Sequence, residues 1–179
     1  MSRLVLGLVV LIAAASCTTT PADSTPPPTT TEGRPAPAAT AWMADLCTTA
    51  SDLRIGLWTS AKDTEPLRQQ LRDQLDTAAD EVDAALDELA AMSAAPVDGG
   101  DTAVTQLGNE LTDLRDELVR GRDDLDELPT DASEKRLGQV VGKVWPNAAA
   151  RAADPFTGVT VSDAMRDAAA GPDCAPFSF

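Results

Sequence analysis

The sequence predicts an all-α fold, in which an antiparallel four-helix-bundle-like domain carries a short C-terminal helix. From Trp42 onward, apolar residues recur at spacings of three and four, the period of a helix with one buried face. β-branched runs with period two do not occur, so strands are not expected. The composition, 43% hydrophobic and 24% charged, is that of a globular protein. We expect this domain to span residues 41–179, which is long enough for a real core.

The first predicted helix covers about residues 41–61, and the second begins near Thr64. Thr64 is a suitable N-cap, and Pro66 then falls in the first turn, where its missing N–H costs little. Each helix shows one apolar stripe. The stripe residues are Trp42, Leu46, Ala50, Leu53 and Leu57 in the first, and Leu75, Ala78, Val82, Ala85, Leu89 and Met92 in the second.

A loop is predicted over 93–101, which contains Pro96 and two consecutive glycines. The third helix then covers about 102–128 and keeps the same heptad pattern, with Gly121 at one core position. The second and third helices are therefore expected to form an antiparallel hairpin with coiled-coil-like packing. The other stripe residues of the third helix are Val104, Leu107, Leu111, Leu114, Leu118, Leu125 and Leu128.

The fourth helix is expected to open with a capping box formed by Asp131 and Glu134. Pro146 is expected to kink or break it. Gly138 and Gly142 stand four residues apart, and we expect them to permit close approach of another helix. They do not form a phosphate-binding loop, because the spacing is one residue short and no Ser or Thr follows the lysine.

A short fifth helix is predicted over about 162–170, with Ser162 at its start and Gly171-Pro172 after its end. The tail beyond it ends in Phe177 and Phe179. These aromatic residues either fold back onto the first helix or form a docking peptide, and the sequence leaves both alternatives open.

Charge and composition exclude several functions. The chain has 14 Lys+Arg and 29 Asp+Glu, a net charge of −15, and no histidine. Nucleic-acid binding requires a basic surface, which such a chain does not offer. Serine-triad catalysis and histidine-based zinc sites both require imidazole. We therefore expect no catalytic residue, no cofactor and no metal.

The N-terminus resembles a bacterial lipoprotein signal peptide over residues 1–16. An apolar run over 4–15 is too short to span a bilayer and ends in Ala14-Ala15-Ser16-Cys17, which resembles a lipobox. The resemblance implies that Cys17 is lipidated, with acyl chains such as palmitate, and becomes the new N-terminus at the extracytoplasmic face of the cell membrane. An ordinary secretory cleavage after Ala15 and an uncleaved anchor are the alternatives.

Residues 17–40 are predicted to form a disordered tether after the lipidated cysteine. Among residues 18–40, eight are Thr and six are Pro, so the segment has little apolar surface to bury. Its prolines favour an extended chain of about 3.1 Å per residue. We expect a spacer between lipid and domain, either bare or O-glycosylated.

The cysteine count supports the lipid anchor. The chain has three cysteines, and an exported chain with an odd thiol needs an explanation. Lipidation of Cys17 leaves Cys47 and Cys174, near the two ends of the domain, which are expected to form a disulfide in an oxidising compartment. Two free thiols are the alternative.

Acidic residues of the second helix recur at spacings of three and four and so share one face. This face either binds a basic partner or simply keeps the helix solvated. Its residues are Asp73, Asp76, Asp80, Asp83 and Asp87.

Tryptophans offer a second candidate site, since Trp58 and Trp145 could line a ligand pocket between helices, although core packing is the commoner role of tryptophan.

The whole layout is similar to that of small exported lipoproteins of high-GC actinobacteria, through the lipobox, the Thr/Pro-rich stretch and the remaining cysteine pair. The resemblance implies an envelope location and no catalytic residues. We expect an interaction or accessory module that binds another envelope protein through a helix face. A carrier that holds a small or lipidic ligand between its helices is the alternative.

Overall fold

The computed structural model describes residues 35–57, 66–177 and 179, and within them the chain is all-helical, as predicted. All of these residues belong to the compact unit Gly33–Phe179. The predicted signal peptide, Cys17 and most of the predicted tether lie outside the described residues. The helices are α1 (Pro37–Gly56), α2 (Leu67–Ala91), α3 (Gly100–Asp126), α4 (Glu134–Ala153), α5 (Asp163–Ala168) and the 3-10 helix η1 (Pro172–Cys174).

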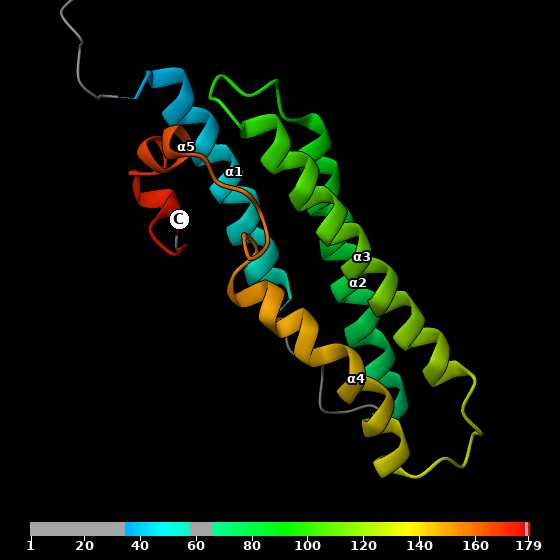
Figure 1. The fold of residues 1–179 in the computed structure, drawn as a ribbon. Helices are drawn as coiled ribbons and strands as arrows, with labels where there is room; N and C mark the ends of the chain where they lie inside the picture. Colours follow the sequence, from blue (N-terminus) through cyan, green and yellow to red (C-terminus); the bar gives the residue numbers. More distant parts are fainter. Residues whose placement is uncertain (1–34, 58–65, 178) are drawn as a thin grey trace, which may run out of the picture. The chain divides into compact units, whose positions relative to one another are not determined.

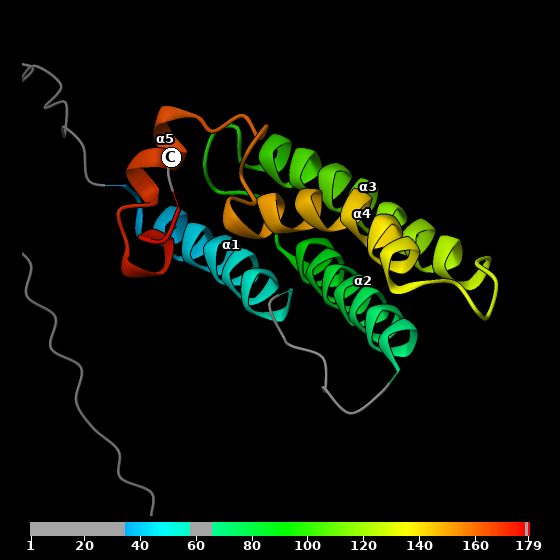
Figure 2. The ribbon, with the colours of Figure 1, turned by 90° about the horizontal axis from the view of Figure 1, so that it is seen from below.

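α2 and α3 form the predicted antiparallel hairpin, and they lie side by side in both ribbon views (Figures 1 and 2). Their stripes of leucine, valine and alanine make up much of the buried core. Gly99 precedes α3 with a φ of 80°, a left-handed conformation that glycine adopts without steric cost. The loop expected between the two helices is therefore present, over about the predicted residues.

α1 packs against the C-terminal half of α2. Near its start, the indole N–H of Trp42 donates a hydrogen bond of 3.1 Å to the carbonyl of Ser93, just past α2. At its end, Gly56 lies against the side chain of Glu81, in the middle of α2. α1 therefore runs antiparallel to α2 and leaves the N-terminal half of α2 to another helix.

α4 packs against the N-terminal half of α2 and runs antiparallel to α3. Val144 of α4 sits over Gly121 of α3, where an added Cβ would lie only 2.8 Å from the Cγ2 of Val144. Further along, Asn147 and Arg151 of α4 reach α3. The Asn147 amide donates to a Glu117 carboxylate oxygen, and Arg151 forms an ion pair with Glu110. The predicted core role of Gly121 is confirmed. α1 and α4 thus cover different halves of the hairpin.

Several predicted helix ends are wrong. α1 begins at Pro37, four residues earlier than expected, so the domain extends into the predicted tether, and Ala39 is already buried. α2 begins at Leu67 and Pro66 directly precedes it, while Thr64 lies outside the described residues. α4 begins after Ser133, and Asp131 does not cap it.

Of the two effects expected of Pro146, the break is wrong, while the kink stays a prediction. The role expected of the two α4 glycines is also wrong. α4 continues past Pro146 to Ala153. Proline frees only the carbonyl of Gly142, and both residues lie on the exposed side of α4, where water can bind that carbonyl. Gly138 and Gly142 do not bring the described helices together, because a Cβ on either would meet no atom of the described residues within 4 Å.

The C-terminal segment folds back onto the domain. Ser162 caps α5 as predicted, since its Oγ accepts a 3.1 Å hydrogen bond from the Met165 N–H. Phe177 is buried and packs edge-on against Phe156, with the ring centroids 5.2 Å apart, and Phe179 contacts both rings. The fold-back alternative for the tail is therefore the one observed.

Candidate functional site

The predicted acidic face lies on α2, and the structure divides it into two sets. Asp76 and Asp83 lie at the seam with α3, where arginines of α3 bind them: Arg122 lies 3.1 Å from Asp76, and Arg115 lies 3.4 Å from Asp83. These two carboxylates therefore help to join the hairpin. They are already engaged within the domain.

The same two arginines also bind their own neighbours on α3. Arg115 lies 2.9 Å from Asp116, and Arg122 lies 2.9 Å from Asp123. The hydrogen bond to Asp116 raises the pKa of Arg115, with Asp83 contributing next, and the hydrogen bond to Asp123 raises the pKa of Arg122 in the same way. Because a raised arginine pKa lies far above neutral, the guanidinium groups stay charged, and their contribution to stability would be lost only as the pH rises through that pKa.

The other three carboxylates face solvent. Asp73, Asp80 and Asp87 are exposed and stand seven residues apart, so they follow one line along the outside of α2. Among the described residues, Asp80 and Asp87 have no ion-pair partner, while Asp73 accepts a 2.7 Å hydrogen bond from the Gln69 side chain. We call these three residues the outer acidic strip. It is the part of the predicted face that remains open to another molecule.

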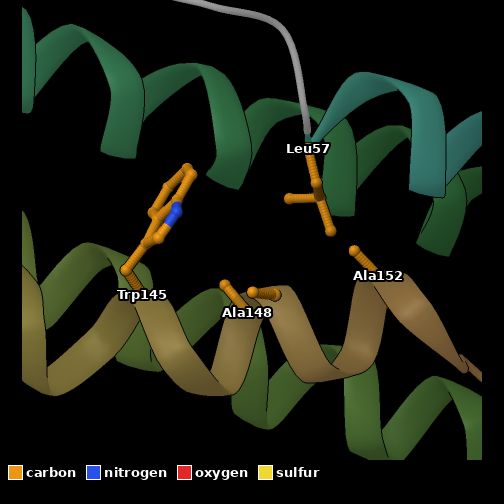
Figure 3. Close-up of a pocket in the computed structure, with 5 residues that line it drawn as sticks. Leu57, Trp145, Ala148 and Ala152 are labelled. Atoms are coloured by element: carbon orange, nitrogen blue, oxygen red, sulfur yellow. The ribbon is translucent and has the colours of Figure 1, made fainter.

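The second candidate site is a small apolar hollow beside Trp145. Figure 3 shows Trp145, Ala148 and Ala152 along one side of α4, facing Leu57 at the end of α1. The space between atoms in the hollow is about 170 Å³, open solvent included, and none of it admits a water-sized sphere. It is the joint where α1 meets α4, and the described side chains leave no space there for a ligand.

The tryptophans differ in position. Trp42 is 5% exposed and belongs to the core, while Trp145 is half-buried at the joint. Trp58, the other predicted pocket residue, lies outside the described residues, so the predicted pairing of Trp58 with Trp145 stays a prediction.

The predicted disulfide joins Cys47 of α1 to Cys174 of η1, with the two Cα atoms 5.1 Å apart. Both cysteines are buried. The bond fixes the C-terminal segment to α1, as expected from the cysteine count.

The described residues contain no group of three or more acidic or cysteine side chains placed to hold a metal ion. Among the helices that the structure describes, none is both long and apolar enough to cross a bilayer.

Sequence reasoning missed one arginine of α2 and a group of basic residues on α4. Arg68 of α2 donates to the carbonyls of Leu125 (2.6 Å) and Leu128 (3.1 Å) and also to that of Pro129, so it caps the C-terminal end of α3. The second group comprises Lys135, Arg136 and Lys143, which are exposed on α4. Arg68 has no sequence signal, because its partners are about 60 residues away, but the α4 group was visible as a basic stretch in an acidic chain.

The comparisons with known proteins add no family to this description. No protein-family model, curated protein or solved structure matches the chain.

Proposed function

We propose that the chain is a lipoprotein anchored through Cys17 at the extracytoplasmic face of the cell membrane, and that its helical domain is an interaction or accessory module in the cell envelope. The outer acidic strip is the observation that carries the second part. It offers three exposed carboxylates on one rigid helix, two of them without an ion-pair partner among the described residues. A basic helix or patch on another envelope protein fits such a strip.

The rest of the domain supports a binding role in a simple way. The pairing of α2 with α3 and the packing of α1 and α4 against it hold α2 in place, so the strip presents its charges in a fixed geometry. A preorganised surface loses little conformational freedom on binding. The Cys17 anchor rests on the resemblance of residues 14–17 to a lipobox and on the odd cysteine count.

The carrier alternative has weaker support. Its predicted pocket residue Trp145 lines a hollow without room for a water molecule, so a ligand would have to displace side chains at the α1–α4 joint. The Trp145→Ala variant tests it. If the chain is a carrier, this variant loses a co-purifying ligand in native mass spectrometry more than it loses stability. If the variant loses ligand and stability equally, or if the parent chain carries no ligand, Trp145 has a packing role.

The anchor is tested by fractionation of cells that produce the full chain. We expect the parent chain in the membrane fraction and the Cys17→Ser variant outside it. Lipidation is contradicted if the Cys17→Ser variant stays in the membrane fraction and its mass differs from that of the parent chain only by the substitution.

The interaction is tested by a photo-crosslinking residue at Ala84, which is exposed on α2 between Asp80 and Asp87. We expect a crosslink to one identified envelope protein, and its loss in the Asp80→Lys/Asp87→Lys variant. The control places the crosslinker at Asn109, which is exposed on α3. Equal crosslinks from Ala84 and Asn109 would contradict a role for the strip. So would a crosslink from Ala84 that persists in the Asp80→Lys/Asp87→Lys variant.

A further inference from the structure

α4 is a basic helix in an acidic molecule. Its four Lys and Arg against one Glu give 4 − 1 = +3, whereas α2 has two Arg against seven Asp and Glu, or 2 − 7 = −5. α3 has three Arg against eight acids, or 3 − 8 = −5. Among the described helices, α4 alone therefore carries a net positive charge.

Three of the α4 cations are free to bind another molecule. Lys135, Arg136 and Lys143 are exposed and form no ion pair with any residue that the structure describes. At about 100° per residue, they lie within roughly 100° of one another around the helix. We call these three residues the basic face. The arginines of the hairpin are, by contrast, largely engaged: Arg68, Arg72, Arg115 and Arg122 all bind groups of the other hairpin helix.

The basic face matches the outer acidic strip in spacing as well as in sign. Arg136 and Lys143 stand seven residues apart, as do Asp80 and Asp87, and seven helical residues span about 10.5 Å. Two opposite-charge pairs can therefore form at once when such helices lie alongside each other. The exposed residue between Arg136 and Lys143 on this face is Gln139, which is uncharged, so no acid of α4 separates the two cations.

We infer that the basic face of α4 binds the outer acidic strip of a second copy of this chain. Both surfaces are exposed, and no ion pair joins them within the part of one copy that the structure describes. The inference rests on the proposed function, since it names one partner of the strip. It commits to a contact between α4 of one copy and α2 of the other.

The net charge of each copy sets the conditions of the test. Copies of charge −15 repel at long range, but charges more than about 8 Å apart are largely screened at 0.15 M salt. Contacting pairs are screened less. The association is therefore measured near 0.15 M salt and is expected to weaken at 1 M.

Sedimentation equilibrium of residues 33–179 measures the association, because this unit contains the described core and both disulfide cysteines. We expect the parent mass to rise toward twice the monomer with concentration. Arg136→Glu/Lys143→Glu and Asp80→Lys/Asp87→Lys should each stay monomeric alone. Mixed one to one, they should form a heterodimer, because the basic and acidic surfaces are then exchanged between the two chains.

Net charge alone cannot produce that result. The unit carries −14, since the removed Arg3, Asp23 and Glu32 sum to −1, and the two variants carry −18 and −10, which together equal the charge of two parent chains. The matched control, Arg54→Glu/Arg120→Glu, changes the charge by the same −4 at exposed cations without an ion pair among the described residues, and should still associate. Circular dichroism confirms that each variant is folded.

A monomeric parent together with a monomeric mixture would overturn the inference. Loss of association in the Arg54→Glu/Arg120→Glu control would also overturn it, because the effect would then be one of net charge. Binding of monomers to vesicles containing phosphatidylglycerol, abolished by Arg136→Glu/Lys143→Glu, would assign the basic face to lipid instead. In any of these cases a crosslink from Ala84 to another envelope protein would leave the proposed function standing.

Discussion

The half of the domain built on α1 and the half built on α4 are held together by different interactions. On the α1 side, a disulfide, a buried indole with a hydrogen bond to Ser93, and a cluster of three phenylalanines hold the chain together. In the α4 half, Val144 fits over Gly121, and Asn147 and Arg151 make polar contacts with α3. In the same half, Arg68 of α2 caps the C-terminal end of α3.

This difference separates a covalent, apolar half from one that depends on close fit and charge. Cross-linking acts mainly by limiting the unfolded chain and is independent of salt. Charged hydrogen bonds depend on a partner's position, and exposed ion pairs weaken with ionic strength. We therefore expect reduction to affect the α1 half first, and substitutions of glycine or arginine to affect the α4 half.

The largest effect is expected from the disulfide. Cys47→Ala/Cys174→Ala should lower the free energy of unfolding by about 2–5 kcal/mol, because the bond closes a long loop and holds η1 on α1. Urea unfolding measures it, and hydrogen exchange should show α5 opening more than α3. Cys17→Ser is the matched control and should leave stability unchanged. A loss of less than 1 kcal/mol would show that the phenylalanine cluster fixes the tail without the bond.

The fit of α4 is tested by a pair of glycines. Gly121→Leu should destabilise by about 1–3 kcal/mol, because its side chain meets Val144 in a packed core. Gly142→Ala should instead stabilise by about 0.5–1 kcal/mol, because alanine is the better helix former and the site is open. Thermal unfolding compares them. If both variants changed the free energy of unfolding in the same direction, the packing of α4 described above would be contradicted.

The cap on α3 is tested by Arg68→Met, which keeps much of the apolar stem and removes the guanidinium. The carbonyls of Leu125 and Leu128 lose a charged donor, and we expect a loss of about 1–2 kcal/mol in urea unfolding. Arg120→Met, at an exposed cation of α3, is the control and should stay within about 0.5 kcal/mol. An equal effect at both positions would mean that net charge, and not the cap, is measured.

The smallest effects are expected on the acidic face, and they should differ in sign. Asp76→Asn removes the partner of Arg122 at 3.1 Å and should cost about 0.2–1 kcal/mol, less in 1 M salt. Asp80→Asn relieves repulsion from the carboxylate four residues earlier and should stabilise by about 0.2–0.5 kcal/mol. Differential scanning calorimetry at two salt concentrations checks both. Destabilisation by Asp80→Asn would show that Asp80 has a structural partner.

Much of the fold follows from local patterns. The 3-4 spacing of leucine, valine and alanine fixes which side of each helix is apolar, and the core residues of α2 and α3 are largely those predicted from that spacing. The end of a helix is harder to predict, because capping groups compete over a few residues. Asp131 and Ser133 both suit an N-cap, and neither side chain makes a capping hydrogen bond to α4.

The candidate site was predictable only in part. The heptad spacing of the aspartates places them on one side of α2, but it does not reveal that Asp76 and Asp83 meet arginines of α3 while Asp80 does not. Those arginines are 32 to 46 residues away in sequence. Their pairing depends on the register of the hairpin, which the packing of both apolar stripes sets.

By itself, the sequence determined the helices, the hairpin, the acidic character of α2 and, through the count of cysteines, the Cys47–Cys174 pair. The tertiary structure alone decided which of several similar residues have a neighbour. Gly121 meets Val144 whereas a Cβ on Gly142 would meet no described atom within 4 Å, and Arg68 caps α3 whereas Arg136 has no ion-pair partner among the described residues. The physical reason is that helical periodicity is a local property of 3.6 residues per turn, while a contact between helices depends on how the whole chain packs.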